Sequence, residues 1–237
     1  MLILLTTIGR YTRPTDRRNH GKHMTMPKDI STIDTLDDLR EFHGEASSGV
    51  KAKIQYRLDQ HTKNFLARSP FLILATNNET GSDASPRGDT PGFIQIIDDT
   101  TVLMPEHPGN RLADSLTNIV VNPMIGMIHF IPGMDETLRI NGKARITNDE
   151  RLLAMVAHKG KMPKLAIVVD IEQVYFHCAK ALMRSHLWDP NLYMPRADFP
   201  TLGKILLDQI KGKDVFADEV NALDANLDAD ARDNLYH

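Results

Sequence analysis

The chain has 237 residues, of which 41% are hydrophobic and 25% are charged, a composition typical of globular proteins. Its formal net charge of -3 gives no reason to expect a general polyanion-binding surface, so we predict no nucleic acid partner. The single cysteine, Cys178, excludes an internal disulfide and a cysteine cluster for zinc, and it favours a reducing, cytoplasmic location. The histidines show no HxxxH or HxH spacing, and we therefore predict no metal site.

The first part of the chain, residues 1–34, is predicted to be a mobile N-terminal extension. It opens with the apolar letters MLILLTTIG, a run much too short to span a bilayer. No basic segment precedes this run, which argues against a secretory signal. We expect no membrane association, a main domain over residues 35–211 and an acidic tail over residues 212–237.

The main domain is predicted to begin with interrupted helices. Apolar residues recur at helical spacing in two groups, the first at Leu36, Leu39 and Phe42 and the second between Ile54 and Leu66. The stretch 44–49 separates them, and Ser69-Pro70 ends the second helix. The apolar run at 71–76 then predicts a buried strand.

The middle of the chain is predicted to be rich in short strands. Residues 84–92 carry an Arg and an Asp, but their two Gly and two Pro make them too broken for a central strand. Residues 137–147 give the clearest strand, because apolar residues alternate strictly with polar and basic ones. We interpret Lys143 and Arg145 as part of a solvated outer face. The other expected strands are 93–97 paired with 101–104 as a hairpin, 124–131 and 166–176.

The stretch from Met104 to Val121 has the features of a ligand site. An apolar strand end breaks at Pro105, and a Pro-Gly turn leads into a helix that we expect to begin at Asn110. Asn110 is a suitable N-cap and Arg111 follows it in the first turn, so the helix start could bind a phosphate. An ordinary capped helix is the alternative. The apolar residues expected on its buried face are Leu112, Leu116, Ile119 and Val120.

The region after the last expected strand holds a second group of cations. A helix is predicted over residues 149–159, before that strand. After it, Lys180, Arg184 and Trp188 are spaced i, i+4 and i+8, so on a helix they would share one face. Two cations and the only Trp suit a flat anionic ligand, and a solvated basic stripe is the alternative. From Lys213 onward the sequence predicts a weak helix or a loose acidic tail.

Together these elements predict one mainly β, barrel-like domain carrying helices, of the α+β class. Four stretches in this order resemble the flavin-nucleotide-binding proteins related to pyridoxamine 5′-phosphate oxidase, specifically the branch of probable FMN-dependent enzymes. They are SPRGDTPGF at 85–93, MPEHPGNRLADSL at 104–116, ETLRINGKARI at 136–146 and FHCAKALMRSHLWDP at 176–190. The resemblance spans about residues 45–195. It implies an FMN-binding split β-barrel that forms a homodimer with FMN in the two clefts between the subunits.

The resemblance also implies roles for individual residues. Arg87 lies where the oxidases place an Arg that contacts phosphate and flavin, and the backbone of Met104 and Pro105 would touch the flavin. Asn110 and Arg111 stand where a pair of basic residues grips the FMN phosphate. Thr137 stands where a Gln hydrogen-bonds the flavin. The residues that would be supplied across the dimer are Lys180, Arg184 and Trp188.

Two departures from the oxidases narrow the implied function. In the oxidases, the strand after the Arg continues with apolar residues and a Lys that contacts the substrate, whereas this chain has Gly-Asp-Thr-Pro-Gly at residues 88–92. The oxidases' Arg-x-His that binds the vitamin phosphate is not evident at the end of the chain. We therefore carry over FMN and not vitamin B6 oxidation.

The implied function is an FMN-dependent oxidoreductase acting on an unidentified small molecule or electron donor. No acid–base pair or nucleophilic triad is evident, which fits an enzyme whose cofactor supplies the chemistry, and no catalytic residue is assigned. A non-catalytic module that binds flavin or haem, or senses redox state, is the second hypothesis. An interaction domain without a cofactor is the third.

Overall fold

The computed structural model describes residues 29–107, 109, 112–212 and 215–236. The chain divides into two units, residues 1–48 and 49–237. In the first unit, helix α1 (Leu36–His43) begins at Thr35, whose hydroxyl accepts a hydrogen bond from the Asp38 amide. The helix ends at Gly44, where φ is +79°, a value that favours glycine.

The helical interpretation of residues 35–68 is confirmed in part: α1 matches the first group, but the second helix begins at Gln60 and not near Ile54, and a short helix lies between them. After α1 come α2 (Ser48–Ala52) and α3 (Gln60–Leu66). A capping box formed by Asp59 and Thr62 starts α3, and its residues Phe65 and Leu66 are buried. By contrast, the apolar stripe of α1 is exposed.

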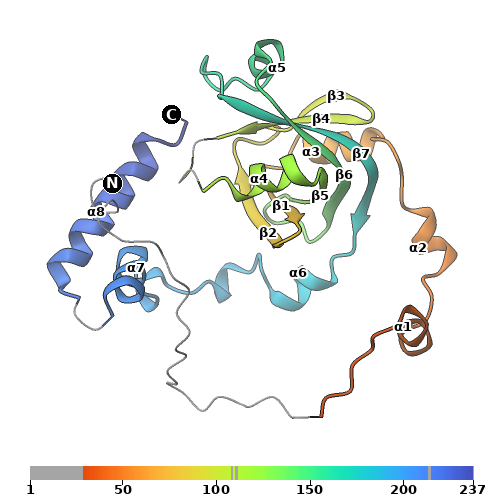
Figure 1. Ribbon diagram of the computed structural model, residues 1–237, viewed down its shortest axis with the longest axis horizontal. Coiled ribbons are helices and arrows are strands. Elements are labelled where there is room, and N and C mark those ends of the chain that lie inside the picture. Colours follow the sequence, from red (N-terminus) through yellow and green to blue (C-terminus); the bar gives the residue numbers. More distant parts are fainter. Residues whose placement is uncertain (1–28, 108, 110–111, 213–214, 237) are drawn as a thin grey trace. The chain divides into compact units, whose positions relative to one another are not determined.

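Seven antiparallel strands form one sheet in the order β2-β1-β5-β6-β7-β4-β3 (Figure 1). The strands are β1 (Phe71–Asn78), β2 (Gly81–Gly88), β3 (Gln95–Asp98), β4 (Thr101–Glu106), β5 (Met124–Phe130), β6 (Thr137–Thr147) and β7 (Leu165–His177). The sheet is open, with β2 and β3 at its edges. The predicted mainly β domain of split-barrel type, with added helices, is confirmed.

The long pair β6 and β7 joins the two wings of the sheet. Strand β5 pairs with the first half of β6, whereas β4 pairs with the first half of β7, at the opposite end of the ribbon. The register shifts between Asn141 and Gly142, which marks a bulge. A Cβ atom at Gly142 would lie 2.1 Å from the Asp170 carbonyl oxygen, so only glycine fits there. The bulge and the long ribbon let the sheet curl.

The concave face of the curled sheet holds the main core. Alternate residues of the strands point inward, as the strict alternation in β6 predicts, and they pack with Phe65 and Leu66 of α3 and Ile119 of α4 (Asp114–Val121). On the outer face, α5 (Glu150–Met155) buries Leu153 against β4 and β7. Helix α5 is shorter than predicted, since Val156 already lies outside it.

Strand β2 agrees with the expectation that residues 84–92 are too broken for a central strand, because β2 lies at the edge of the sheet. It nevertheless pairs with β1 without a break from Gly81 to Gly88, across Pro86. Because β2 is an edge strand, a residue without an amide hydrogen costs no ladder hydrogen bond on the side facing away from β1.

The chain after β7 is helical. It comprises α6 (Lys180–Ser185), short 3-10 turns at Pro190–Leu192 and Arg196–Asp198, α7 (Leu202–Lys211) and α8 (Ala217–Asp233). Helices α7 and α8 are joined where the Gly203 amide donates to Asp224 at 2.8 Å and Lys211 pairs with Glu219 at 2.7 Å. Of the two alternatives for the acidic tail, helix is the one observed. No helix in the described part of the chain is both apolar and long enough to cross a membrane.

Candidate functional site

The open side of the curled sheet brings together the ends of two strands that are not neighbours in it. We call this place the seam; it consists of residues 87–89 at the end of β2 and residues 106–107 at the end of β4. Arg87 Nη1 donates to Glu106 Oε2 at 2.5 Å, and both side chains are only 17% exposed. Side chains therefore close the barrel where backbone pairing does not.

Arg87 retains a donor for a ligand. Its Nε atom is buried and has no hydrogen-bond partner among the described residues. A buried polar atom usually finds an acceptor, and a guanidinium offers several donors in a fixed fork that matches phosphate and carboxylate oxygens. The seam can therefore accept an anionic group beside the Arg87–Glu106 pair.

Asp89 is the most highly connected buried carboxylate at the seam. Its side chain is 4% exposed and accepts hydrogen bonds from the Thr90 amide at 2.6 Å, His107 Nε2 at 2.7 Å and the Tyr236 hydroxyl at 2.9 Å. A second imidazole, His158 Nδ1, lies 3.6 Å away. Burial by itself raises the pKa of Asp89, but these hydrogen bonds outweigh burial, and the pKa lies below its usual value. Asp89 is thus held as a carboxylate.

Helix α4 packs against β1 and β2 on the side of the β1–β2 turn (Figure 1). Ser115 bonds Ser85 and Asp83, each at 2.8 Å, and Asn118 donates to Thr76 at 3.0 Å. These polar contacts fix α4 through the face at Ser115, Asn118 and Ile119.

The predicted start of this helix is wrong, and its predicted buried face is right for Leu116 and Ile119 but wrong for Leu112 and Val120. Its N-cap is Ala113, with φ +58° and no side-chain cap, so the helix begins at Asp114 and not at Asn110. This phase turns Leu112 and Val120 to the outside, and the acidic first residue makes the N-terminus unfavourable for phosphate. Asn110 and Arg111 themselves lie outside the described residues.

Met104 and Pro105 lead directly to the seam. Both are buried in β4, where they pair with Ile167 and Ala166 of β7, and the Met104 side chain lies in the core. Only their backbone could reach a ligand at the seam, which is the role that the resemblance implies for them.

The other four candidate residues lie around the end of the β6–β7 ribbon that is opposite to its pairing with β4. Thr137 is buried and pairs with His177, three strands across the sheet from Arg87, or about 14 Å at the usual interstrand spacing. Lys180 and Arg184 are exposed on α6, which follows β7.

Trp188 does not share their helix face, because α6 ends at Ser185, where His186 adopts φ +51°. Its indole instead donates to the Met134 carbonyl at 2.8 Å. The prediction of one helical face for Lys180, Arg184 and Trp188 is therefore wrong.

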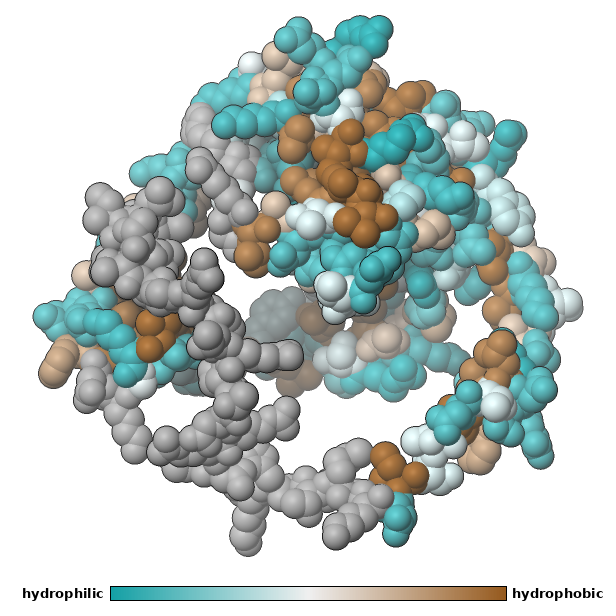
Figure 2. Space-filling model, viewed as in Figure 1, coloured by the Kyte–Doolittle hydropathy of each residue, from teal (hydrophilic) through white to brown (hydrophobic). Residues whose placement is uncertain are grey.

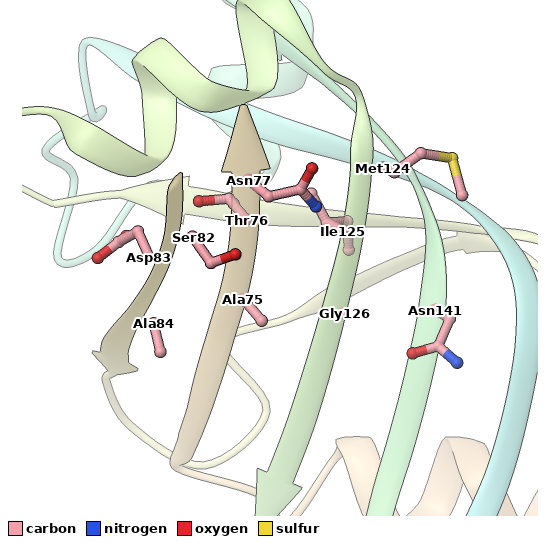
Figure 3. A pocket seen from close by; sticks show the side chains of 10 residues that line it. All are labelled: Ala75, Thr76, Asn77, Ser82, Asp83, Ala84, Met124, Ile125, Gly126 and Asn141. Atoms are coloured by element: carbon pink, nitrogen blue, oxygen red, sulfur yellow. The ribbon is translucent and has the colours of Figure 1, made fainter. Parts of the chain in front are cut away.

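A separate hollow of about 440 Å³ lies on the outer face of β1, β2, β5 and β6 (Figure 3). Ala75 and Gly126 keep it open, and a Cβ atom at Gly126 would lie only 3.3 Å from Asn141 Oδ1. Its lining comes from the β1–β2 turn end of these strands, whereas Arg87 lies near the other end of β2. The seam and the hollow are thus distinct places.

Sequence reasoning missed most partners of the seam. Asp89 was noted beside Arg87, but no local pattern links either residue to Glu106, His158 or Tyr236. The described residues contain no group of three or more His, Cys, Asp or Glu side chains that could hold a metal ion.

An open antiparallel split barrel with a cationic and carboxylate-lined seam defines the class of this protein. The family model described as pyridoxamine 5′-phosphate oxidase matches residues 58–178, which is half of the chain. The chain therefore belongs to the pyridoxamine 5′-phosphate oxidase family. A search of curated proteins found no match.

Solved structures that resemble the chain each cover about half of it. HupZ of Group A Streptococcus is 18% identical, with 50% of this chain and 93% of that chain covered and a TM-score of 0.42. The general stress protein 26 of Bacillus anthracis is 15% identical, with 49% and 94% covered and a TM-score of 0.35. An FMN-binding protein of Syntrophomonas wolfei is 12% identical, with 48% and 80% covered and a TM-score of 0.37.

Proposed function

We propose that this protein is an FMN-binding flavoprotein and an oxidoreductase acting on a small molecule. The observation that supports this most directly is Arg87, whose buried Nε lacks a partner among the described residues at the seam. The fit is chemical, because a buried guanidinium donor suits a phosphate oxygen. When bound, FMN would supply the electron-transfer chemistry.

Within one chain, Arg87 would hold the anionic group and the backbone of Met104 and Pro105 would border the flavin. Glu106 orients Arg87 through their 2.5 Å contact and offsets part of its charge. The remaining candidates lie around the end of the β6–β7 ribbon away from the β4 residues of the seam: Thr137, Lys180, Arg184 and Trp188. We infer that they act on the site of a second copy.

Exposed apolar residues support a homodimer. On α4, Val120 is 77% exposed and Val121 60%, and Leu112 just before the helix is 66% exposed. Figure 2 shows hydrophobic residues gathered on the surface in the region of α4. A contiguous apolar patch of this kind is typical of an interface, and a two-fold dimer is the commonest closed assembly.

The phosphate contact can be tested by titrating FMN and riboflavin. The test variant is Arg87→Met/Glu106→Gln, in which both charges are removed so that neither is left buried alone. The matched control is Glu106→Gln, which removes the same carboxylate but keeps Arg87. Relative to the control, the double variant should bind FMN about ten- to hundredfold more weakly. Riboflavin, which lacks the phosphate, should bind both variants equally. Equal FMN affinity in the two variants would place the phosphate elsewhere.

The dimer can be tested by light scattering. Val120→Glu places a charge in the apolar patch and should give the mass of one chain. Ile210→Glu, an exposed apolar position on α7, is the control and should leave the dimer intact. A wild-type protein with the mass of one 26.7 kDa chain would overturn this part of the proposal.

The shared site can be tested by mixing two defective variants. Arg87→Met/Glu106→Gln and Arg184→Ala should each bind FMN weakly as homodimers. After subunit exchange, a site built across the dimer leaves one intact site per heterodimer, and a tight-binding fraction appears. If both groups act within one chain, every site carries a defect and no tight fraction forms.

The oxidoreductase activity needs its own measurement. Protein with bound flavin should be reduced in the steady state by NADPH, NADH or reduced deazaflavin when a suitable acceptor is present. Bound flavin that is not turned over by any of these donors would favour a binding or redox-sensing module.

A further inference from the structure

A side chain from beyond α8 lies against the seam. The Tyr236 hydroxyl donates to Asp89 Oδ1 at 2.9 Å. The Tyr236 ring stacks on the His158 ring, with centroids 4.1 Å apart and planes 2° from parallel. His107 meets the same ring edge-on at 5.4 Å and 88°. Three separate parts of the barrel domain thus hold one aromatic side chain.

This attachment is local. Helix α8 has no buried residue along its length, and its ties to α7 do not involve the barrel. Next to Tyr236, Arg232 and Leu235 line a hollow of about 100 Å³ with the loop at 158–161. A segment held by few buried contacts opens at lower free-energy cost than the core does.

The carboxylate that receives Tyr236 does not depend on it. If Tyr236 leaves, Asp89 keeps the Thr90 amide at 2.6 Å and His107 Nε2 at 2.7 Å, and water can replace the phenol. Opening therefore loses one hydrogen bond, the stack on His158 and the edge contact with His107, without leaving a buried charge unpaired. Both the closed and the open arrangement of Tyr236 are chemically satisfied.

We propose that Tyr236 is a latch that closes the seam and limits how fast a ligand enters and leaves the site beside Arg87. Asp89 lies two residues after Arg87, and His107 lies two residues after Pro105, so the latch closes on both segments that border the proposed FMN site. The contacts of Tyr236 support the latch by themselves, whereas its effect on FMN rests on the proposed function.

The latch contact can be tested in the full chain without added flavin. In the wild-type protein, the stacked Tyr236 ring should shift the imidazole proton resonances of His158. Tyr236→Leu should move these resonances to their unstacked positions. Tyr193→Leu is the matched control, because Tyr193 is an exposed tyrosine in the same helical region, and it should leave them unchanged. Identical His158 resonances in the wild type and Tyr236→Leu would overturn the latch.

The gating effect can be tested by stopped-flow measurement of flavin fluorescence. Tyr236→Leu should raise the association and dissociation rates of FMN together, each by roughly tenfold, as expected for loss of a hydrogen bond to a charged group. Tyr236→Phe, which keeps the ring, should raise them less, and Tyr193→Leu should not change them.

The outcomes separate the two proposals. Lost stacking with unchanged rates would overturn gating and leave the proposed function intact. No FMN binding by the wild-type chain would overturn the proposed function together with the gating of FMN, while the His158 resonances would still decide whether the latch contact exists.

Discussion

Two buried titratable side chains, Asp89 at the seam and His129 inside the barrel, have opposite surroundings. Asp89 receives three hydrogen bonds, and its pKa is lowered although burial opposes this. His129 is fully buried on the inner face of β5, level with Leu72 and Leu138, and neither ring nitrogen has a partner among the described residues. Burial lowers the pKa of His129 to about 3.

The comparison teaches that burial alone does not mark a functional residue. At Asp89, side chains from distant segments converge on one charge, as a ligand site requires. At His129, the surroundings are apolar, and the imidazole fills space as a neutral ring. We therefore place Asp89 in a candidate ligand site and expect His129 to affect only stability.

The largest expected effect is acid destabilisation through His129. Its folded pKa lies below the usual histidine value of 6.5, so stability is present above pH 6.5 and is lost as the pH falls towards the folded pKa. At about pH 4 the loss should reach about 3 kcal/mol of unfolding free energy.

Urea unfolding across this pH range measures the effect. His129→Leu should remove most of the pH dependence, whatever its effect on stability at neutral pH. His61→Gln, at an exposed position on α3, is the control and should retain the dependence. An unchanged slope in His129→Leu would show that His129 has a partner in solution.

A smaller effect is expected at Asp89. Asp89→Asn keeps the shape but removes the charge that its donors share, which should lower the unfolding free energy by about 2 kcal/mol at neutral pH. Because the folded pKa of Asp89 is below 3.8, its contribution is present above that value and is lost as the pH falls through the folded pKa. The wild type and Asp89→Asn should therefore converge only below about pH 4. Convergence at a higher pH would contradict the lowered pKa.

The smallest effect is expected for an exposed ion pair on β6 and β7. Lys143 Nζ lies 3.0 Å from Glu172 Oε1, and both side chains are about half exposed. Glu172→Gln should change the unfolding free energy by less than about 1 kcal/mol, and high salt should remove the difference. If Glu172→Gln lowered the unfolding free energy as much as Asp89→Asn does, then solvent exposure would not explain the difference between the Lys143–Glu172 pair and Asp89.

Local patterns predicted the fold well where local physics decides it. Strand β6 runs from Thr137 to Thr147 as predicted, because alternation sets which face is buried. Residues 84–92 were expected not to form a central strand, and β2 is an edge strand, where Pro86 is tolerated; that edge position is revealed only by the assembled topology.

The site could be predicted only in part. Arg87 and Asp89 stood out in the sequence, but their partners Glu106 and Tyr236 are brought to them by the curl of the sheet and by the chain beyond α8. The helix expected at Asn110 failed because Asp114 starts α4, and the contacts of Ser115 and Asn118 with β1 and β2 fix the helix phase.

The attachment of β4 to β7 has a consequence for synthesis on the ribosome. When β4 leaves the ribosome, only the short β3 is available to pair with it. Its other edge stays unpaired until β5, β6 and finally β7 have been synthesised. Pairings between segments so distant in the chain form slowly, and an unpaired apolar strand can join a neighbouring nascent chain meanwhile. Because Val102, Leu103 and Met104 are all apolar, the newly made protein should depend on chaperones that shield this strand until β7 leaves the exit tunnel.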